Sequence, residues 1–141
     1  MTCDNGRYLT PEGKAAVLAE WGATLAALHG QTGPGVPDPA IVPWCTRLNA
    51  MEGVCTLQSC AGHVERDGTR TAGHLWLWLD MRRSQEWNRR AHELAATPGV
   101  ERVARLYSPW GQEVHEVWFE GEERGRLTSS LAAITSFVAR L

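Results

Sequence analysis

The segment His74–Asp80, "HLWLWLD", decides the fold, because bulky residues alternate along it with the two-residue period of a β-strand. Leucines occupy every second position, at Leu75, Leu77 and Leu79, and the positions between them carry a histidine, two tryptophans and an aspartate. Both faces of the strand therefore carry bulky side chains. This pattern predicts a central strand, with one face against helices and the other against a second layer or a ligand.

The segments on either side of this strand indicate an α+β fold. The sequence predicts two helices and a strand before it, and a helix, two strands and a final helix after it. The expected elements are a helix that begins at Thr10 and ends before Gly30, a helix at Pro43–Met51, a strand at Val54–Gln58, a helix capped by Ser84 and ended by Thr97-Pro98-Gly99, strands at Val100–Tyr107 and Glu113–Glu120, and a C-terminal helix marked by Leu131, Ile134, Phe137 and Leu141. The order ααββαββα favours a mostly antiparallel sheet of about four strands with helices packed on it.

The composition is that of one globular domain spanning residues 1–141. Hydrophobic residues make up 43% and charged residues 21%, which is typical of a folded chain. The formal net charge is -2, and no block of like charges is present. Proteins that grip long duplexes through phosphates usually carry a basic surplus, so we do not expect long nucleic acid as a partner.

Cysteine usage and hydropathy predict a cytoplasmic protein. The N-terminus has no secretory-signal pattern, and the longest apolar run, Leu75–Leu79, is too short to cross a bilayer. The four cysteines are Cys3, Cys45, Cys55 and Cys60. A chain of this length holds a core without disulfides, so we expect reduced thiols. Because the longest apolar run is so short, we also expect no membrane association.

The loop Ser59–Gly73 gathers reactive side chains between two expected strands. Connections of this length without secondary structure of their own are often functional. Ser59 offers a hydroxyl, Cys60 a thiol and His63 an imidazole, and the backbone N–H groups around Gly62 are suited to cradle an anion. We therefore expect a pocket here for a small anionic, nucleotide-like ligand. The alternative is a tight structural turn with Cys60 buried.

The longer segment Leu48–Val64, "LNAMEGVCTLQSCAGHV", resembles a known family. In the tRNA wybutosine-synthesis methyltransferase-like family, a helix with a Leu-Asn pair leads into a strand, and a threonine then precedes a Ser-Cys-Ser-Gly-Arg loop. Thr56, Ser59, Cys60 and Gly62 match that pattern. The resemblance implies an α/β fold and S-adenosylmethionine-dependent tRNA modification, with this loop at the active site.

Two positions of the loop depart from the family pattern. His63 stands where the family has arginine, and it is likewise a potential donor and cation. Ala61 replaces the second serine. Similar Ser-Cys-x-Gly-His loops occur in small uncharacterised bacterial and phage proteins. The resemblance is therefore one of the loop, and it implies a ligand site there more directly than it implies methyl transfer.

Two residues outside the loop are further candidates for ligand contact. Arg82, with Arg83, is expected at a strand-to-helix turn, where guanidinium and backbone N–H groups are suited to hold a phosphate. Trp110 is expected at a hairpin tip, where it is placed to stack on a base or on a partner. The alternatives are a solvated helix start and a tryptophan packed on its own hairpin.

Metal binding and thiol catalysis are alternative interpretations of the same loop. Cys60 and His63 have C-x-x-H spacing, with His74 and His115 as distant candidates, but a structural zinc site usually has a second close pair. Cysteine–histidine catalysis needs contact between the two side chains, which a shared loop does not guarantee. We therefore expect neither a metal ligand nor a catalytic residue.

The leading hypothesis is a binding protein that sequesters or senses a signalling nucleotide without turnover. The expected ligand contacts are Thr56, Ser59, Cys60, Gly62, His63, Arg82 and Trp110. One alternative is a methyltransferase of the tRNA-modifying type, for which S-adenosylmethionine is the cofactor. Another is an interaction module that forms a homo-oligomer through the tryptophan-rich face of its sheet.

Overall fold

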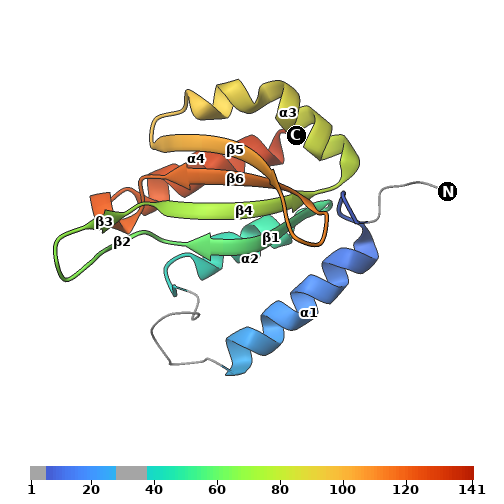
Figure 1. Ribbon diagram of the computed structural model, residues 1–141, viewed down its shortest axis with the longest axis horizontal. Helices are drawn as coiled ribbons and strands as arrows, with labels where there is room; N and C mark the ends of the chain where they lie inside the picture. Colours follow the sequence, from blue (N-terminus) through green and yellow to red (C-terminus); the bar gives the residue numbers. More distant parts are fainter. Residues whose placement is uncertain (1–5, 28–37) are drawn as a thin grey trace.

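A computed structural model describes residues 6–27 and 38–141. Its centre is a four-stranded antiparallel sheet of order β1-β4-β6-β5 (Figure 1). The strands are β1 (Val54–Cys60), β4 (Gly73–Leu79), β5 (Val100–Tyr107) and β6 (Glu113–Phe119). The predicted α+β class is confirmed.

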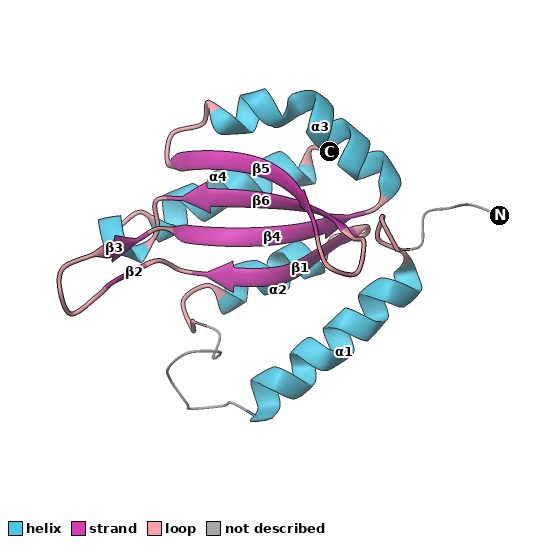
Figure 2. Ribbon diagram, viewed as in Figure 1, coloured by secondary structure: helices cyan, strands magenta, loops and turns pink. Residues whose placement is uncertain are grey.

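Helices cover the two faces of the sheet unequally. The helices are α1 (Pro11–Ala27), α2 (Val42–Asn49), α3 (Met81–Ala95) and α4 (Leu127–Ala139), with a 3₁₀ turn η1 (Glu122–Arg124) before α4. Helices α2, α3 and α4 share one core with the sheet, whereas α1 lies alongside β1, with Trp21 packed against that core (Figure 2). Within the described ranges, no helix is both long and apolar enough to span a lipid bilayer.

Strand β4 is an inner strand, as its alternation predicts. Leu75, Leu77 and Leu79 are fully buried on the face that meets α2, α3 and α4. Burial of each such side chain contributes roughly 1.5–3 kcal/mol relative to exposure. On the opposite face, Trp78 is buried against Cys55 of β1. We call this opposite side of the sheet the open face, because α1 covers only part of it.

The start of α3 differs from the expected one. Asp80 is the N-cap, and its carboxylate accepts a hydrogen bond from the backbone N–H of Arg83 at 2.8 Å. Ser84, the expected cap, lies one turn inside the helix and is buried. The prediction was wrong because both residues are good caps, and the strand ends directly at the first of them.

The connection between β1 and β4 also differs from expectation. It carries a small hairpin, β2 (His63–Val64) paired with β3 (Arg70–Thr71). The expected strand end at Gln58 is wrong as well, because β1 continues to Cys60 beyond an irregularity between Thr56 and Gln58. The segment Ser59–Gly73, which the sequence predicts as a ligand-binding loop, is therefore the end of a strand followed by a hairpin.

The C-terminal boundary of α2 is set by a side-chain contact. The helix ends at Asn49 rather than at Met51, because the Asn49 amide turns toward β1. Its oxygen accepts a hydrogen bond from the Thr56 N–H at 2.8 Å, and its nitrogen donates to the Thr56 hydroxyl at 3.0 Å. The expected end of α1 at Gly30 and the cysteine Cys3 lie outside the described residues.

The close approach of Gly121 to the hairpin connection gives a stability prediction. A Cβ at Gly121 would lie 2.0 Å from the backbone oxygen of Ala61, so one of the two backbone segments must move in Gly121→Ala. We expect the free energy of unfolding to fall by about 1–3 kcal/mol in urea denaturation. The control is Gly22→Ala in α1, where a Cβ meets no heavy atom within 4 Å. Equal urea midpoints for the two variants would contradict the prediction.

Candidate functional site

Three tryptophans from separate segments line one cavity on the open face. Trp21 comes from α1, Trp76 from β4 and Trp110 from the turn between β5 and β6. The cavity has a volume of about 460 Å³. Trp110 is 80% exposed, whereas Trp21 and Trp76 are partly buried. We call this cavity the tryptophan groove.

The rest of the groove is mainly polar and uncharged. Thr56 and Gln58 from β1 and Gln112 from the β5–β6 turn lie in its wall. Among the described residues that line it, Glu20 of α1 is the one charged side chain. The groove therefore offers aromatic surfaces together with amide and hydroxyl groups, a combination suited to a planar ligand with polar edges.

The turn that carries Trp110 is held by Ser108. The Ser108 hydroxyl accepts hydrogen bonds from the backbone N–H groups of Trp110 at 3.3 Å and Gln112 at 3.1 Å. The backbone N–H of Gly111 donates to the Ser108 carbonyl, and Gly111 has a φ of 85°, a left-handed conformation that favours glycine. The exposed position of Trp110 is thus a product of a hydrogen-bonded turn.

The orientation of Trp76 is fixed by an ion pair across the sheet. Its indole N–H donates to one Glu116 carboxylate oxygen at 2.6 Å, and Arg102 donates to the other at 3.1 Å. Burial raises the pKa of Glu116, but the indoles of Trp118 and Trp76 and the guanidinium of Arg102 hold it below its usual value. Glu116 is therefore an ionised link between the groove and the exposed side chain of Arg102.

The backbone of the Ser-Cys-Ala-Gly-His segment is bonded within the protein. The Ala61 N–H donates to the Asp38 carboxylate at 2.9 Å, and the Ala61 carbonyl accepts from the Glu122 N–H at 2.8 Å. The Gly62 N–H faces the Cys60 sulfur at 3.5 Å. The N–H groups expected to cradle a ligand anion are thus already occupied, one of them by an anion of the chain itself.

Ser59 points away from Cys60 and His63, whose side chains lie close together. Ser59 pairs with Leu75 on the helix-covered face, whereas Cys60 pairs with His74 on the open face. His63 is about half exposed and contacts Glu65. The structure therefore does not gather Ser59, Cys60 and His63 around one cavity.

Of the other predicted contacts, two lie in the tryptophan groove and one does not. Trp110 lines the groove, and Thr56 borders it with its hydroxyl bonded to Asn49 of α2. Arg82 lies in the first turn of α3, where its guanidinium donates to the Leu141 carbonyl at 2.8 Å and ties the helix to the C-terminus. Sequence reasoning missed Trp21 as a contact, whereas it had assigned the face of β4 that carries Trp76 to a second layer or a ligand.

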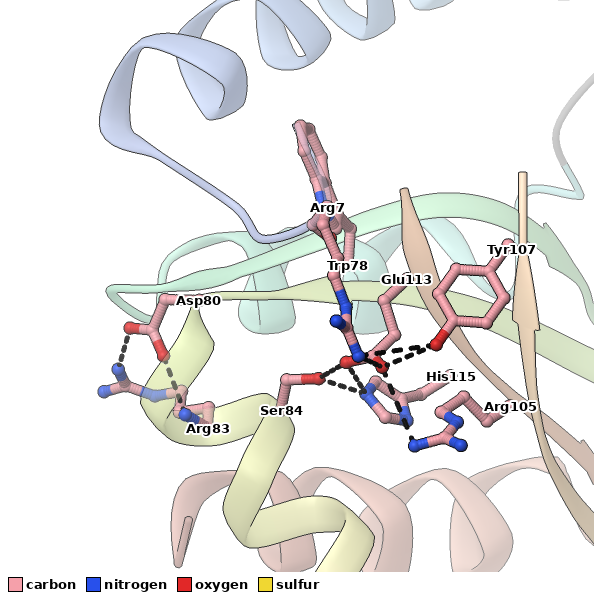
Figure 3. A network of polar contacts seen from close by, with 9 residues as sticks. All are labelled: Arg7, Trp78, Asp80, Arg83, Ser84, Arg105, Tyr107, Glu113 and His115. Atoms are coloured by element: carbon pink, nitrogen blue, oxygen red, sulfur yellow. Dashed lines mark hydrogen bonds and ion pairs between the residues drawn. The ribbon is translucent and has the colours of Figure 1, made fainter. Parts of the chain in front are cut away.

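A second polar cluster lies at the end of the sheet (Figure 3). The Glu113 carboxylate is unexposed and accepts hydrogen bonds from Arg7 at 3.1 Å and from the Ser84 hydroxyl. Arg105 lies 3.7 Å from the same carboxylate, and Nε2 of His115 lies 2.7 Å from the Ser84 hydroxyl oxygen. Sequence reasoning missed this cluster because its members are far apart in the chain.

This cluster has the residue types of a hydrolase triad but not its geometry. Ser84 and His115 are 1% and 0% exposed, so a substrate cannot reach the hydroxyl. Ser84 and Glu113 also both lie on the Nε2 side of the ring, whereas a triad carboxylate orients the opposite nitrogen. The cluster is therefore a structural network between α3 and the sheet.

Burial sets the ionisation of this network. It lowers the pKa of His115 to about 4, so the ring is neutral near neutral pH. Burial raises the pKa of Glu113, but hydrogen bonds from Ser84 and Arg7 outweigh it and hold that pKa below its usual value. A neutral imidazole therefore lies beside an ionised carboxylate inside the protein.

Comparison with known proteins identifies a shared fold. No protein-family model and no curated protein matches the sequence significantly. The chain is similar in structure to the PH1069 protein from Pyrococcus horikoshii, with a TM-score of 0.52 and 12% sequence identity. The similarity covers 99% of this chain and 92% of that one. At this identity the similarity establishes the fold alone, and the site has to be argued from the residues of this chain.

The buried histidine gives a pH prediction. In the folded state the pKa of His115 is about 4, against an ordinary value of 6.5. Between these two pH values the unfolded state therefore binds a proton on His115 that the folded state does not bind. The free energy of unfolding should therefore fall as pH falls from 6.5 to about 4, by roughly 3 kcal/mol from this residue. Urea denaturation across that range measures the loss. The loss of unfolding free energy should shrink in His115→Phe. It should persist in His92→Gln, a change at an exposed helix position. An unchanged loss in His115→Phe would contradict the assignment of this pH dependence to His115.

Proposed function

We propose that this protein binds a small nucleotide-like ligand, with the planar base held in the tryptophan groove. The observation that carries the proposal is the convergence of Trp21, Trp76 and Trp110, from three separate segments, on one cavity. Stacking of a base on an aromatic side chain contributes roughly 1–3 kcal/mol and requires no particular base. Two or three such surfaces are enough to hold one base.

The dimensions and polar groups of the groove support a ligand of this size. Small-molecule sites commonly have volumes of roughly 300–1,000 Å³, and the groove falls within that range. The side-chain amides of Gln58 and Gln112 each carry donors and an acceptor, which suit the mixed hydrogen-bonding edge of a base. An apolar planar molecule would leave these groups without partners.

The anionic end of the ligand is assigned to Arg102 rather than to the Ser59–His63 segment. Its guanidinium is 64% exposed, and it is linked to Trp76 through Glu116 by two hydrogen bonds. Only part of its N–H fork is used by Glu116, so further donors remain for a phosphate. The alternative site at Ala61 would require displacement of the Asp38 carboxylate.

The neutral character of the groove favours binding without turnover. Its described lining offers amides, hydroxyls and indoles, with Glu20 as the charged member. General acid–base chemistry needs a group that titrates near the operating pH and reaches the substrate. Sequestration or sensing of a nucleotide is therefore the use that this lining supports best.

Titration calorimetry with nucleoside monophosphates and a cyclic dinucleotide tests the proposal. We expect Trp110→Ala to weaken binding about 5- to 100-fold, from the loss of one stacking surface. Arg102→Gln should weaken binding of a nucleotide more than binding of the corresponding nucleoside, because only the nucleotide carries phosphate. The control is Trp44→Ala, a tryptophan of α2 on the helix-covered side of the sheet.

Other outcomes of the same titration would favour the alternatives. Affinity for S-adenosylmethionine without affinity for nucleotides would favour a methyltransferase of the tRNA-modifying type. Self-association in light scattering that Trp110→Ala abolishes, with no nucleotide bound, would favour an interaction module. Either result, or equal affinities for Trp110→Ala and the unmodified protein, would overturn the proposed function.

A further inference from the structure

A thiol, an imidazole and a carboxylate lie in line where β1 meets the β2–β3 hairpin. The Cys60 sulfur lies 3.8 Å from Nδ1 of His63, and Nε2 of His63 lies 2.7 Å from a Glu65 carboxylate oxygen. The two contacts use opposite nitrogens of the ring. This arrangement differs from the buried network around Glu113, in which the serine and the carboxylate share one nitrogen.

The Glu65 carboxylate determines which nitrogen of the His63 ring carries the hydrogen, and therefore which nitrogen can act as a base toward Cys60. A neutral imidazole carries one hydrogen, and the Glu65 carboxylate can only accept, so it selects the tautomer with hydrogen on Nε2. The lone pair of Nδ1 then faces the Cys60 thiol. The Gly62 N–H also faces that sulfur, at 3.5 Å, and stabilises negative charge that develops there.

Access distinguishes Cys60 from the other described cysteines. Cys45 and Cys55 are fully buried, whereas Cys60 is partly exposed. The side chains of His63 and Glu65 are about half exposed. A small molecule in solution can therefore reach the sulfur and its base together.

The surroundings of the Cys60 sulfur keep the thiol protonated, so its reaction needs a base. Burial raises the pKa of the Cys60 thiol above its ordinary value, and the carboxylates of Asp38 and Glu123 raise it further against the lowering effect of the Gly62 N–H. The His74 ring occupies the paired position on β4. The thiol is therefore protonated near neutral pH, and its reaction requires a neighbouring group to take the proton.

The thiol lies next to the tryptophan groove. On the open face, Cys60 pairs with His74, and the preceding pair on that face is Gln58 with Trp76, both of which line the groove. Pairs two residues apart along a strand are separated by about 6.5 Å. A small molecule bound in the groove thus has the sulfur as a near neighbour.

We propose that Cys60, His63 and Glu65 form a nucleophilic thiol centre that attacks an electrophilic carbon of a small molecule. The S–H bond breaks and its proton passes to Nδ1 of His63. The Cys60 sulfur forms a bond to the carbon, and the leaving group departs with the bonding electron pair. The imidazolium, paired with Glu65, then returns its proton to water. This activity goes beyond ligand binding and does not depend on what occupies the groove.

Alkylation by iodoacetamide, followed by peptide mass spectrometry, tests the centre. The reaction joins the Cys60 sulfur to the acetamide carbon and releases iodide. The full chain carries Cys3→Ser, which removes the one cysteine outside the described residues. His63→Gln should slow alkylation of Cys60 at least about tenfold near neutral pH, and Glu65→Gln should slow it less. His92→Gln, a change at an exposed position of α3, should leave the rate unchanged.

The dependence of the alkylation rate on pH distinguishes catalysis by a base from simple accessibility of the Cys60 thiol. With His63 as base, Cys60 should still be alkylated at pH values at which its thiol is protonated, and His63→Gln should remove most of that reaction. An unchanged rate and profile in His63→Gln, or faster alkylation of Cys45 or Cys55 than of Cys60, would overturn the proposal. If circular dichroism shows that His63→Gln is unfolded, Glu65→Gln decides, and an unchanged rate there overturns the proposal.

Discussion

The rest of the structure depends on the covering of β4, whose two faces are both too apolar to be left in water. Its leucine face requires the layer formed by α2, α3 and α4. Its tryptophan face requires a second cover, and among the described residues Val17 of α1 supplies it at Trp78, where Leu9 and Cys55 also pack. At Trp76 the described residues leave the cover incomplete, and the tryptophan groove occupies that place. The groove is therefore a consequence of one helix covering part of a sheet face.

The buried carboxylate of Glu113 links the position of α1 to this arrangement. The carbonyl of Arg7, just before α1, accepts hydrogen bonds from the Glu113 N–H at 2.9 Å and the Trp78 indole at 3.1 Å. The Arg7 guanidinium binds the carboxylate of the same Glu113. A buried charge of this kind is tolerated only with such partners, and here the partners attach the N-terminal segment to the sheet. The network thus helps to set where α1 lies, and hence the width of the groove.

The architecture was predictable because it follows from patterns within single segments, whereas the site was not. The alternation at His74–Asp80 identified an inner strand with two apolar faces, and the order of elements followed from helix caps and strand periods. The loop prediction at Ser59–His63 depended on groups whose partners come from elsewhere, since Asp38 and Glu122 occupy the backbone of Ala61. A segment viewed alone shows which donors it has, but not whether the folded chain already uses them.

A single irregularity in β1 decides which side chains reach the open face. In a regular strand, residues two apart share a face, so Thr56, Gln58 and Cys60 would all face the helices. The extra residue between Thr56 and Gln58 reverses the alternation. It directs Gln58 into the tryptophan groove and Cys60 toward His74, and it turns Ser59 inward. The tryptophan groove and the Cys60 thiol, with His63 beside it, lie on one surface because the strand carries this one extra residue. A substitution that restored the regular register would remove both features together.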